Sequence, residues 1–259
     1  EPAFYEDDRA LGYLFRVLRH SPTALNVYVG LEDGSFRQAR RIQDKSVKIH
    51  DASPPEGTEY AYRILEQVAG EPVLDRYIFL TPDQEELGEI DIESGYDPRE
   101  RAWYQEAAAA GTTIMTDPEL FFVFGLVGFT VAAPFETDGV LRGVVASDVT
   151  LDNFSDYLAE NPLSPNSLSY ILDERGNVLA ASDQSAAFGG ANSGVQLPHV
   201  TDAGNRMVAL AYATRPRDGD SDVYTYTADG QDYIIGLSEF AEELGKPWRL
   251  MVVTPLADF

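Results

Sequence analysis

The stretch VLRGVVASDVTLDNFSDYLAENPLSPNSLSYIL, residues 140–172, decides how the chain is divided. It opens with a strand pattern over 140–149 and continues with an amphipathic pattern over 150–160 that predicts a short helix. The following NPLSPN, residues 161–166, combines proline, asparagine and serine, which favour turns over regular structure. A new strand pattern begins at once over 168–172. We therefore expect two modules, with their boundary at this polar segment.

Outward from this boundary, both halves show the same order of elements. Each begins with a strand, a polar turn and a second strand, passes through an irregular middle, and ends in a run of strands. Asp-Gly pairs at 33–34, 138–139 and 229–230 predict hairpin turns, because glycine accepts the positive φ that such turns require. The Gly-, Ser- and Asn-rich residues 184–205 are expected to form a long loop. The main expected strands lie at 24–30, 35–42, 59–65, 73–80, 128–135 and 140–149, and then at 168–172, 178–182, 223–227, 232–238 and 248–256.

An amphipathic helix is predicted before the first strand, from about residue 7 to residue 20. Its apolar stripe either packs on the chain's own sheets or forms a homodimer through this helix. The predicted fold is thus α+β, a helix followed by two related modules, each an antiparallel sheet flanked by helices. The stripe consists of Leu11, Leu14, Phe15 and Leu18.

Composition excludes several classes of function. The 259 residues include 43 acidic and 19 basic side chains, so a formal charge of −24 repels nucleic acid. There is no cysteine, which removes disulfides and thiolate metal sites. His20, His50 and His199 lie far apart, and the DGDSD segment at 218–222 lacks the glycine and closing glutamate of a calcium loop. We expect neither a metal nor another cofactor, and we expect the 218–222 segment to be solvated.

The segment YDPRERAWYQEAAAAG, residues 96–111, carries the main candidate site. Asp97 is expected to cap a helix that starts at Pro98. Arg101 and Tyr104 then share a helix face, whereas Trp103 points to another side, so these residues can surround one ligand only above the helix N-terminus. A guanidinium there can bind a carboxylate through two parallel hydrogen bonds. The alternative is a helix that packs its aromatic residues beneath a surface cation.

Asp148 is the candidate for the opposite charge. In a strand, Asp148 shares a face with Val144 and Ala146, which places a carboxylate among small apolar side chains. Burial of an unpartnered carboxylate is costly. We therefore expect a partner, which is Arg101, a ligand amine or a backbone amide. The alternative is that Asp148 merely ends its strand as a turn or cap residue.

These motifs resemble a known family. YDPRERAWYQEA, TDP and GVLRGVVASDVTLDNFSDYL are similar to the signature of the double Cache sensor domain, the extracytoplasmic part of many bacterial transmembrane receptors. VYVGLEDGSF near the start and WRLMVVTPLADF at the end extend the resemblance over nearly the whole chain. It implies a long N-terminal helix over 1–24, a membrane-distal, PAS-like, ligand-binding module over 25–160, and a stacked, membrane-proximal, PAS-like module over 161–259.

The resemblance also implies roles for individual residues. In family members that bind amino acids or amines, the residues matching Arg101 and Trp103 bind the carboxylate and the residue matching Asp148 binds the amine. Tyr96 and Tyr104 belong to the same expected ligand-binding set. This chain departs from the pattern at Glu119, where such members usually have a tyrosine. A glutamate there favours a more cationic ligand such as a polyamine, or it points to solvent, while the bulky segment 120–129 could fill the pocket.

The sequence therefore predicts a periplasmic or extracellular sensor domain, tethered to the inner membrane of a bacterium in the full-length protein. It binds an amino acid, amine or small carboxylate, is no enzyme itself, and relays the signal to a cytoplasmic cyclase, phosphodiesterase, kinase or chemotaxis output. Similarity of the Phe- and Gly-rich segment 120–129 to cyclase- and phosphodiesterase-linked members favours those two outputs. The alternatives are an envelope solute-binding or adhesive protein without output, and a secreted hydrolase with paired carboxylates.

Overall fold

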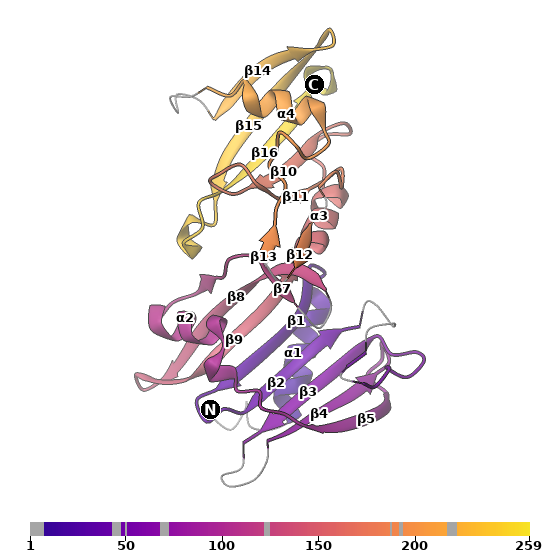
Figure 1. Ribbon diagram of the computed structural model, residues 1–259, viewed down its shortest axis with the longest axis vertical. Coiled ribbons are helices and arrows are strands. Elements are labelled where there is room, and N and C mark those ends of the chain that lie inside the picture. Colours follow the sequence, from indigo (N-terminus) through magenta and orange to yellow (C-terminus); the bar gives the residue numbers. More distant parts are fainter. Residues whose placement is uncertain are drawn as a thin grey trace. The chain divides into compact units, whose positions relative to one another are not determined.

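The computed structural model describes residues 8–42, 48–49, 51–67, 73–121, 125–186, 188–191, 194–216 and 222–259 (Figure 1). The chain divides into two compact units, Glu1–Val149 and Thr150–Phe259. Each has an antiparallel sheet and its own buried core, which agrees with the expected α+β fold of two modules. The DGDSD segment falls mostly outside the described residues, as does His50. Within the described part, no helix is long and apolar enough to cross a membrane.

The first unit is built on a nine-stranded sheet with the order β5-β4-β3-β2-β1-β9-β8-β6, and β7 also pairs with β8. The two longest strands, β8 and β9, form a hairpin whose turn residues Asp138 and Gly139 both have positive φ, as the sequence predicts. Strands β5, β6 and β7 were not predicted. The strands are β1 (Ala24–Leu31), β2 (Phe36–Arg41), β3 (Tyr60–Glu66), β4 (Leu74–Leu80), β5 (Glu86–Glu93), β6 (Ile114–Met115), β7 (Glu119–Phe121), β8 (Leu126–Thr137) and β9 (Val140–Thr150).

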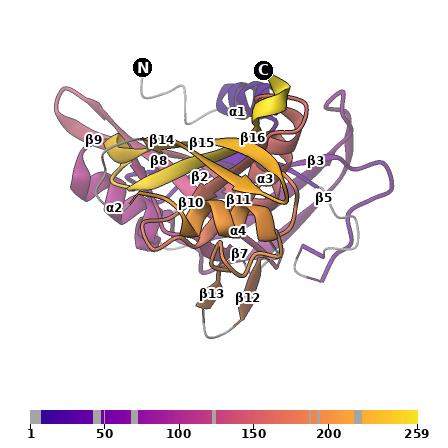
Figure 2. The same cartoon turned by 90° about the horizontal axis from the view of Figure 1, so that it is seen from above.

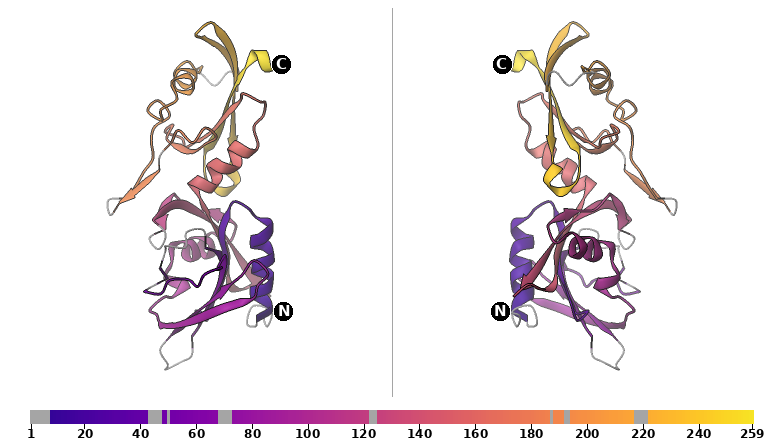
Figure 3. Two further views of the ribbon diagram at one scale, coloured as in Figure 1. Left: turned by 90° about the vertical axis from the view of Figure 1, so that its right-hand side faces the viewer. Right: turned by 90° about the vertical axis from the view of Figure 1, so that its left-hand side faces the viewer.

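Helix α1 (Asp8–His20) covers one face of this sheet, and α2 (Ala102–Ala110) lies on the other face (Figure 3). The apolar stripe of α1 packs against inward-facing residues of β1 and β2 such as Val29 and Ala39. The stripe is therefore buried by the chain's own sheet and is not available as a dimer surface, which overturns that form of the dimer hypothesis. Its four members, Leu11, Leu14, Phe15 and Leu18, are each exposed by no more than 4%.

The expected helix start at Asp97 is wrong in detail. Asp97 does accept a hydrogen bond from the Arg99 amide, but it caps a short 3-10 turn, Pro98–Glu100. The backbone at Arg101 is extended, with φ −88° and ψ 143°, and α2 begins only at Ala102. Because Arg101 precedes the helix, the helical phase that would separate Arg101 from Trp103 does not apply. The interruption allows both side chains to face the same space.

The second unit has a five-stranded sheet with the order β11-β10-β16-β15-β14. Figure 2 shows α4 against one face of this sheet, where Val208 and Ala211 join the buried core. The expected loop at 184–205 contains the short hairpin β12–β13, and α4 follows it unpredicted. The elements are α3 (Leu151–Glu160), β10 (Leu168–Leu172), β11 (Val178–Ala181), β12 (Gly189–Ala191), β13 (Gly194–Gln196), α4 (Arg206–Ala213), β14 (Val223–Ala228), β15 (Gln231–Phe240) and β16 (Trp248–Pro255).

Candidate functional site

A cavity of about 260 Å³ lies in the first unit, on the sheet face opposite α1. Strand register explains its floor, because residues paired across antiparallel strands point to the same face. Asp148 of β9 pairs with Asn26 of β1, which pairs with Arg40 of β2. One row further on, Tyr28 pairs with Gln38. All five residues line the cavity, so its floor crosses three neighbouring strands.

Asp148 is held by neutral donors. Its carboxylate accepts hydrogen bonds from Asn26 Nδ2 at 2.8 Å, from the Tyr28 hydroxyl at 2.7 Å and from the Thr130 hydroxyl at 2.7 Å. These contacts replace the expected pairing with Arg101 or with a backbone amide. Burial raises the pKa of Asp148, against the opposing effect of the three hydrogen bonds. Among the described residues, no cation bonds this carboxylate directly, although the charge of Arg40 acts on it.

Arg101 also lines the cavity, from the segment before α2. Its guanidinium lies 5.6 Å from the centroid of the Tyr96 ring and is exposed. Among the described residues it has no hydrogen bond or ion pair, so its donors are available. Trp103 is 7% exposed and packs edge-on against Tyr28, with 4.9 Å between ring centroids. An exposed cation and a fixed indole thus border the same cavity.

The structure brings together Tyr96, Arg101, Trp103, Glu119 and Asp148 from the expected site. Glu119 is exposed at β7, and partial burial followed by the charge of Asp148 raises its pKa. Of the neighbouring bulky segment, the described residues Leu120 and Phe121 line the cavity without filling it, and residues 122–124 lie outside the described part.

Tyr104 is placed differently. It is not among the residues that line the cavity, and its ring packs edge-on against Trp103 with 5.6 Å between centroids. Burial raises the pKa of the Tyr104 hydroxyl, and the charges of Arg99 and Glu32, which do not line the cavity, also act on it. Tyr104 therefore contacts the Trp103 indole but does not itself border the cavity.

Sequence reasoning missed the contribution of β2 and β3. Arg40 is 4% exposed yet lines the cavity, and burial lowers its pKa to about 10. Arg63 binds Asp75 through two hydrogen bonds of 2.9 and 2.6 Å and lies 4.3 Å from the centroid of the Tyr96 ring. Alternation within the predicted strand 35–42 was the available signal, since it places Phe36, Gln38 and Arg40 on one face.

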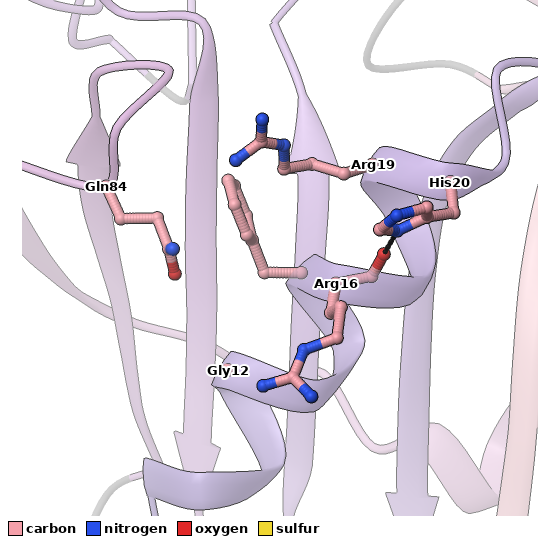
Figure 4. Close-up of a pocket in the computed structure, with 6 residues that line it drawn as sticks. Gly12, Arg16, Arg19, His20 and Gln84 are labelled. Atoms are coloured by element: carbon pink, nitrogen blue, oxygen red, sulfur yellow. Dashed lines mark hydrogen bonds between the residues drawn. The ribbon is translucent and has the colours of Figure 1, made fainter.

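A second hollow of about 480 Å³ lies at α1, and Figure 4 shows Gln84 reaching toward Arg16 and Arg19. Its polar residues are exposed, and the oxygen of the Gln84 amide already accepts a hydrogen bond from Tyr62. No carboxylate is among the described residues that line it. It therefore offers donors for an anion but no partner for an amine, and the smaller cavity is the better candidate for a ligand with both groups. No group of three potential metal ligands occurs in the described part of the chain.

Comparison with known proteins identifies a family and several relatives of this chain. Residues 13–156 match the family described as "Methyl-accepting chemotaxis protein-like, first PDC sensor domain". Over 159 residues the chain is 31% identical to the chemotaxis protein McpA of Pseudomonas putida, covering 61% of this chain and 22% of that protein. Over 167 residues it is 28% identical to adenylate cyclase 1 of Rhizobium meliloti, covering 64% of this chain and 25% of that protein.

A solved structure supports the fold. The ligand-binding domain of the Pseudomonas fluorescens chemoreceptor CtaA, in complex with L-serine, is 17% identical and aligns with a TM-score of 0.51. The alignment covers 98% of this chain and 82% of that one. By contrast, the chain spans only about a quarter of the length of the two curated relatives above.

Proposed function

Because this chain belongs to the methyl-accepting chemotaxis protein-like PDC sensor domains, we propose that its first unit binds an amino acid or a closely related amine in the cavity between α2 and the sheet. The observation that carries the proposal is one cavity bordered by both an available guanidinium, Arg101, and a half-buried carboxylate, Asp148. Its volume of about 260 Å³ suits a ligand of amino-acid size.

The carboxylate end of the ligand is assigned to Arg101. A guanidinium that has no hydrogen bond or ion pair within the described residues can offer two parallel N–H groups to a carboxylate. The Trp103 indole adds a donor and a fixed wall, because its packing on Tyr28 leaves it little freedom. The aromatic ring of Tyr96 lies beneath the cation and limits the positions that the guanidinium can adopt.

The amine end is assigned to Asp148. Three neutral hydrogen bonds fix the carboxylate without cancelling its charge, and burial strengthens its attraction for a cation. Binding an ammonium also relieves the cost of keeping that charge buried. Glu119, at the border of the cavity, adds a second negative charge that favours an amine over a simple carboxylate.

For the full-length protein, we propose a bacterial receptor whose extracytoplasmic part includes this chain and which is tethered to the inner membrane. In it the first unit is the membrane-distal one, and the second unit passes the signal toward the membrane. The relatives named above include a chemotaxis protein and an adenylate cyclase, so either kind of cytoplasmic output is consistent with this sensor. Any dimer uses a surface other than the buried stripe of α1.

Isothermal titration calorimetry against the common L-amino acids, polyamines and small carboxylates tests the proposal. We expect Arg101→Ala to weaken the binding of a carboxylate ligand by about 1.5–3 kcal/mol, the scale of a charged hydrogen bond. Arg16→Ala is the matched control, because Arg16 is an exposed arginine on the opposite side of the same sheet. Equal affinities in the wild type and both variants would refute the assignment of the carboxylate end.

A further inference from the structure

Gln38 is a buried polar residue whose side chain faces the cavity. It is 7% exposed, lies on β2 and lines the cavity. Within the described part of the chain, its side-chain amide forms no hydrogen bond. The amide nitrogen and oxygen of Gln38 are not fully buried, and the cavity that Gln38 lines is where a ligand can reach them. The Gln38 amide thus offers a donor and an acceptor at the wall of the space where the ligand is proposed to bind.

The position of Gln38 in the sheet separates it from the two ends already assigned. Gln38 pairs with Tyr28 of β1, whose hydroxyl donates a hydrogen bond to Asp148. On the other side of β2, Gln38 pairs with Arg63 of β3. Strand β2 lies two strand spacings from β9, which is roughly 10 Å. An amino acid whose ammonium group meets Asp148 can therefore direct its side chain along the floor toward β2.

The charges around Gln38 indicate which side chain would suit it. Arg40 and Arg63 line the same part of the floor, and although Asp75 pairs with Arg63, the charge of Arg40 favours hydrogen-bond acceptors over further cations. An amide or carboxylate meets this requirement, whereas an apolar side chain would leave the Gln38 amide without a partner. A site that forms a hydrogen bond to a polar group of its substrate discriminates strongly against analogues that lack this group.

We propose that the Gln38 amide forms a hydrogen bond with the side chain of the ligand, and that the preferred ligands are amino acids whose side chain carries an amide or a carboxylate. This inference rests on the proposed function, because it takes the amino and carboxyl ends to be held by Asp148 and Arg101. It names a third contact of the same site, on a strand that the binding motif around α2 does not include.

Calorimetric titration with L-glutamine, L-glutamate and L-methionine tests it, because these ligands have side chains of similar length. We expect the wild-type chain to bind glutamine or glutamate at least about tenfold more tightly than methionine, the size of one hydrogen bond to a buried group. Gln38→Met keeps the length of the side chain but removes both polar groups. We expect it to abolish this preference and leave the affinity for methionine equal or higher.

Gln38→Glu is the charge control. It should weaken glutamate binding by about tenfold relative to glutamine, since two carboxylates would then face each other. The failure of this proposal and the failure of the proposed function are distinguishable. Wild-type binding of methionine as tight as that of glutamine and glutamate overturns the role of Gln38 while the proposed function stands, and this comparison needs no variant. If Arg101→Ala removes binding but Gln38→Met leaves every affinity unchanged, the role of Gln38 is likewise overturned while the proposed function stands. The failure of every amino acid to bind overturns both proposals.

Discussion

At the scale of single residues, the protonation of Asp148 gives ligand binding a predictable pH dependence. The ionised carboxylate attracts an ammonium, and protonation removes that attraction. Because burial raises the pKa of Asp148, protonation begins at a higher pH than for an ordinary aspartate. We expect the affinity for an amino acid to fall on acidification toward this raised pKa, which calorimetry between neutral pH and about pH 4 would measure. An affinity that does not change over this range would contradict the role of Asp148.

The ligand-free protein should respond to Asp148 in the opposite direction. A carboxyl group with a raised pKa in the folded state binds its proton more tightly there than in the unfolded chain. Its contribution to the free energy of unfolding is fully present below the ordinary aspartate pKa and is lost as the pH rises through the raised value. Asp148→Asn should remove this trend and reduce the pH dependence of binding to the part that comes from Glu119, whose pKa is also raised, as thermal melts with and without ligand would show.

Most residues of the predicted ligand-binding set line one cavity, whereas Tyr104, from the same motif as Arg101 and Trp103, does not. Arg101 and Trp103 border the cavity as expected, although the reason is a break in the helix at Arg101 that the sequence pattern did not show. The partners of Asp148 could not be predicted, because Asn26 and Thr130 reach it across strands that are distant in sequence. Gln38 was missed for the same reason, since its partner strands become known only from the sheet order.

At the scale of elements, the contact between β1 and the segment before α2 holds the site together. Gly30 on β1 allows this close approach, because an added Cβ would lie 2.7 Å from Pro98 Cβ and 2.9 Å from Trp103 Cη2. We expect Gly30→Ala to displace Pro98 and Trp103, to lower the free energy of unfolding by about 1–3 kcal/mol and to weaken ligand binding. Thermal unfolding and calorimetry on the same sample would measure both effects.

Gly12→Ala in α1 is the control for that prediction. An added Cβ at Gly12 would meet nothing within 4 Å, so the substitution is free of steric cost. Alanine favours the helix over glycine by about 0.5–1 kcal/mol, and we therefore expect a small gain in stability with unchanged affinity. If both glycine variants lost affinity to the same degree, the β1 contact would not be what positions Trp103.

Elements with strong periodicity were predicted well, and those defined by tertiary contacts were not. The helix around Leu14 and the hairpin at Asp138-Gly139 each carry their signal within a few residues. The edge strand β5 and the two-residue strand β6 do not, because pairing with β4 and β8 defines them. The sequence alone also did not decide what covers the apolar stripe of α1, since the same stripe suits a dimer or an intramolecular core.

At the scale of the whole molecule, the described residues that line the cavity all lie between Asn26 and Asp148, within the first unit. The second unit has a separate core that includes Ile235, which is fully buried. We expect Ile235→Ala to destabilise the second unit by about 2–5 kcal/mol through the cavity that it leaves. At a temperature where the protein remains folded, the affinity for an amino acid should not change.

Leu65→Ala provides the comparison, because Leu65 is equally buried but belongs to the core of the first unit beside Phe36 and Trp103. This substitution should lower both stability and affinity, since Phe36 and Trp103 also line the cavity. Calorimetric binding curves for the two variants, together with their thermal melts, separate the contributions of the units. A loss of affinity in Ile235→Ala as large as that in Leu65→Ala would mean that the second unit takes part in binding, and the site would then extend beyond the cavity described above.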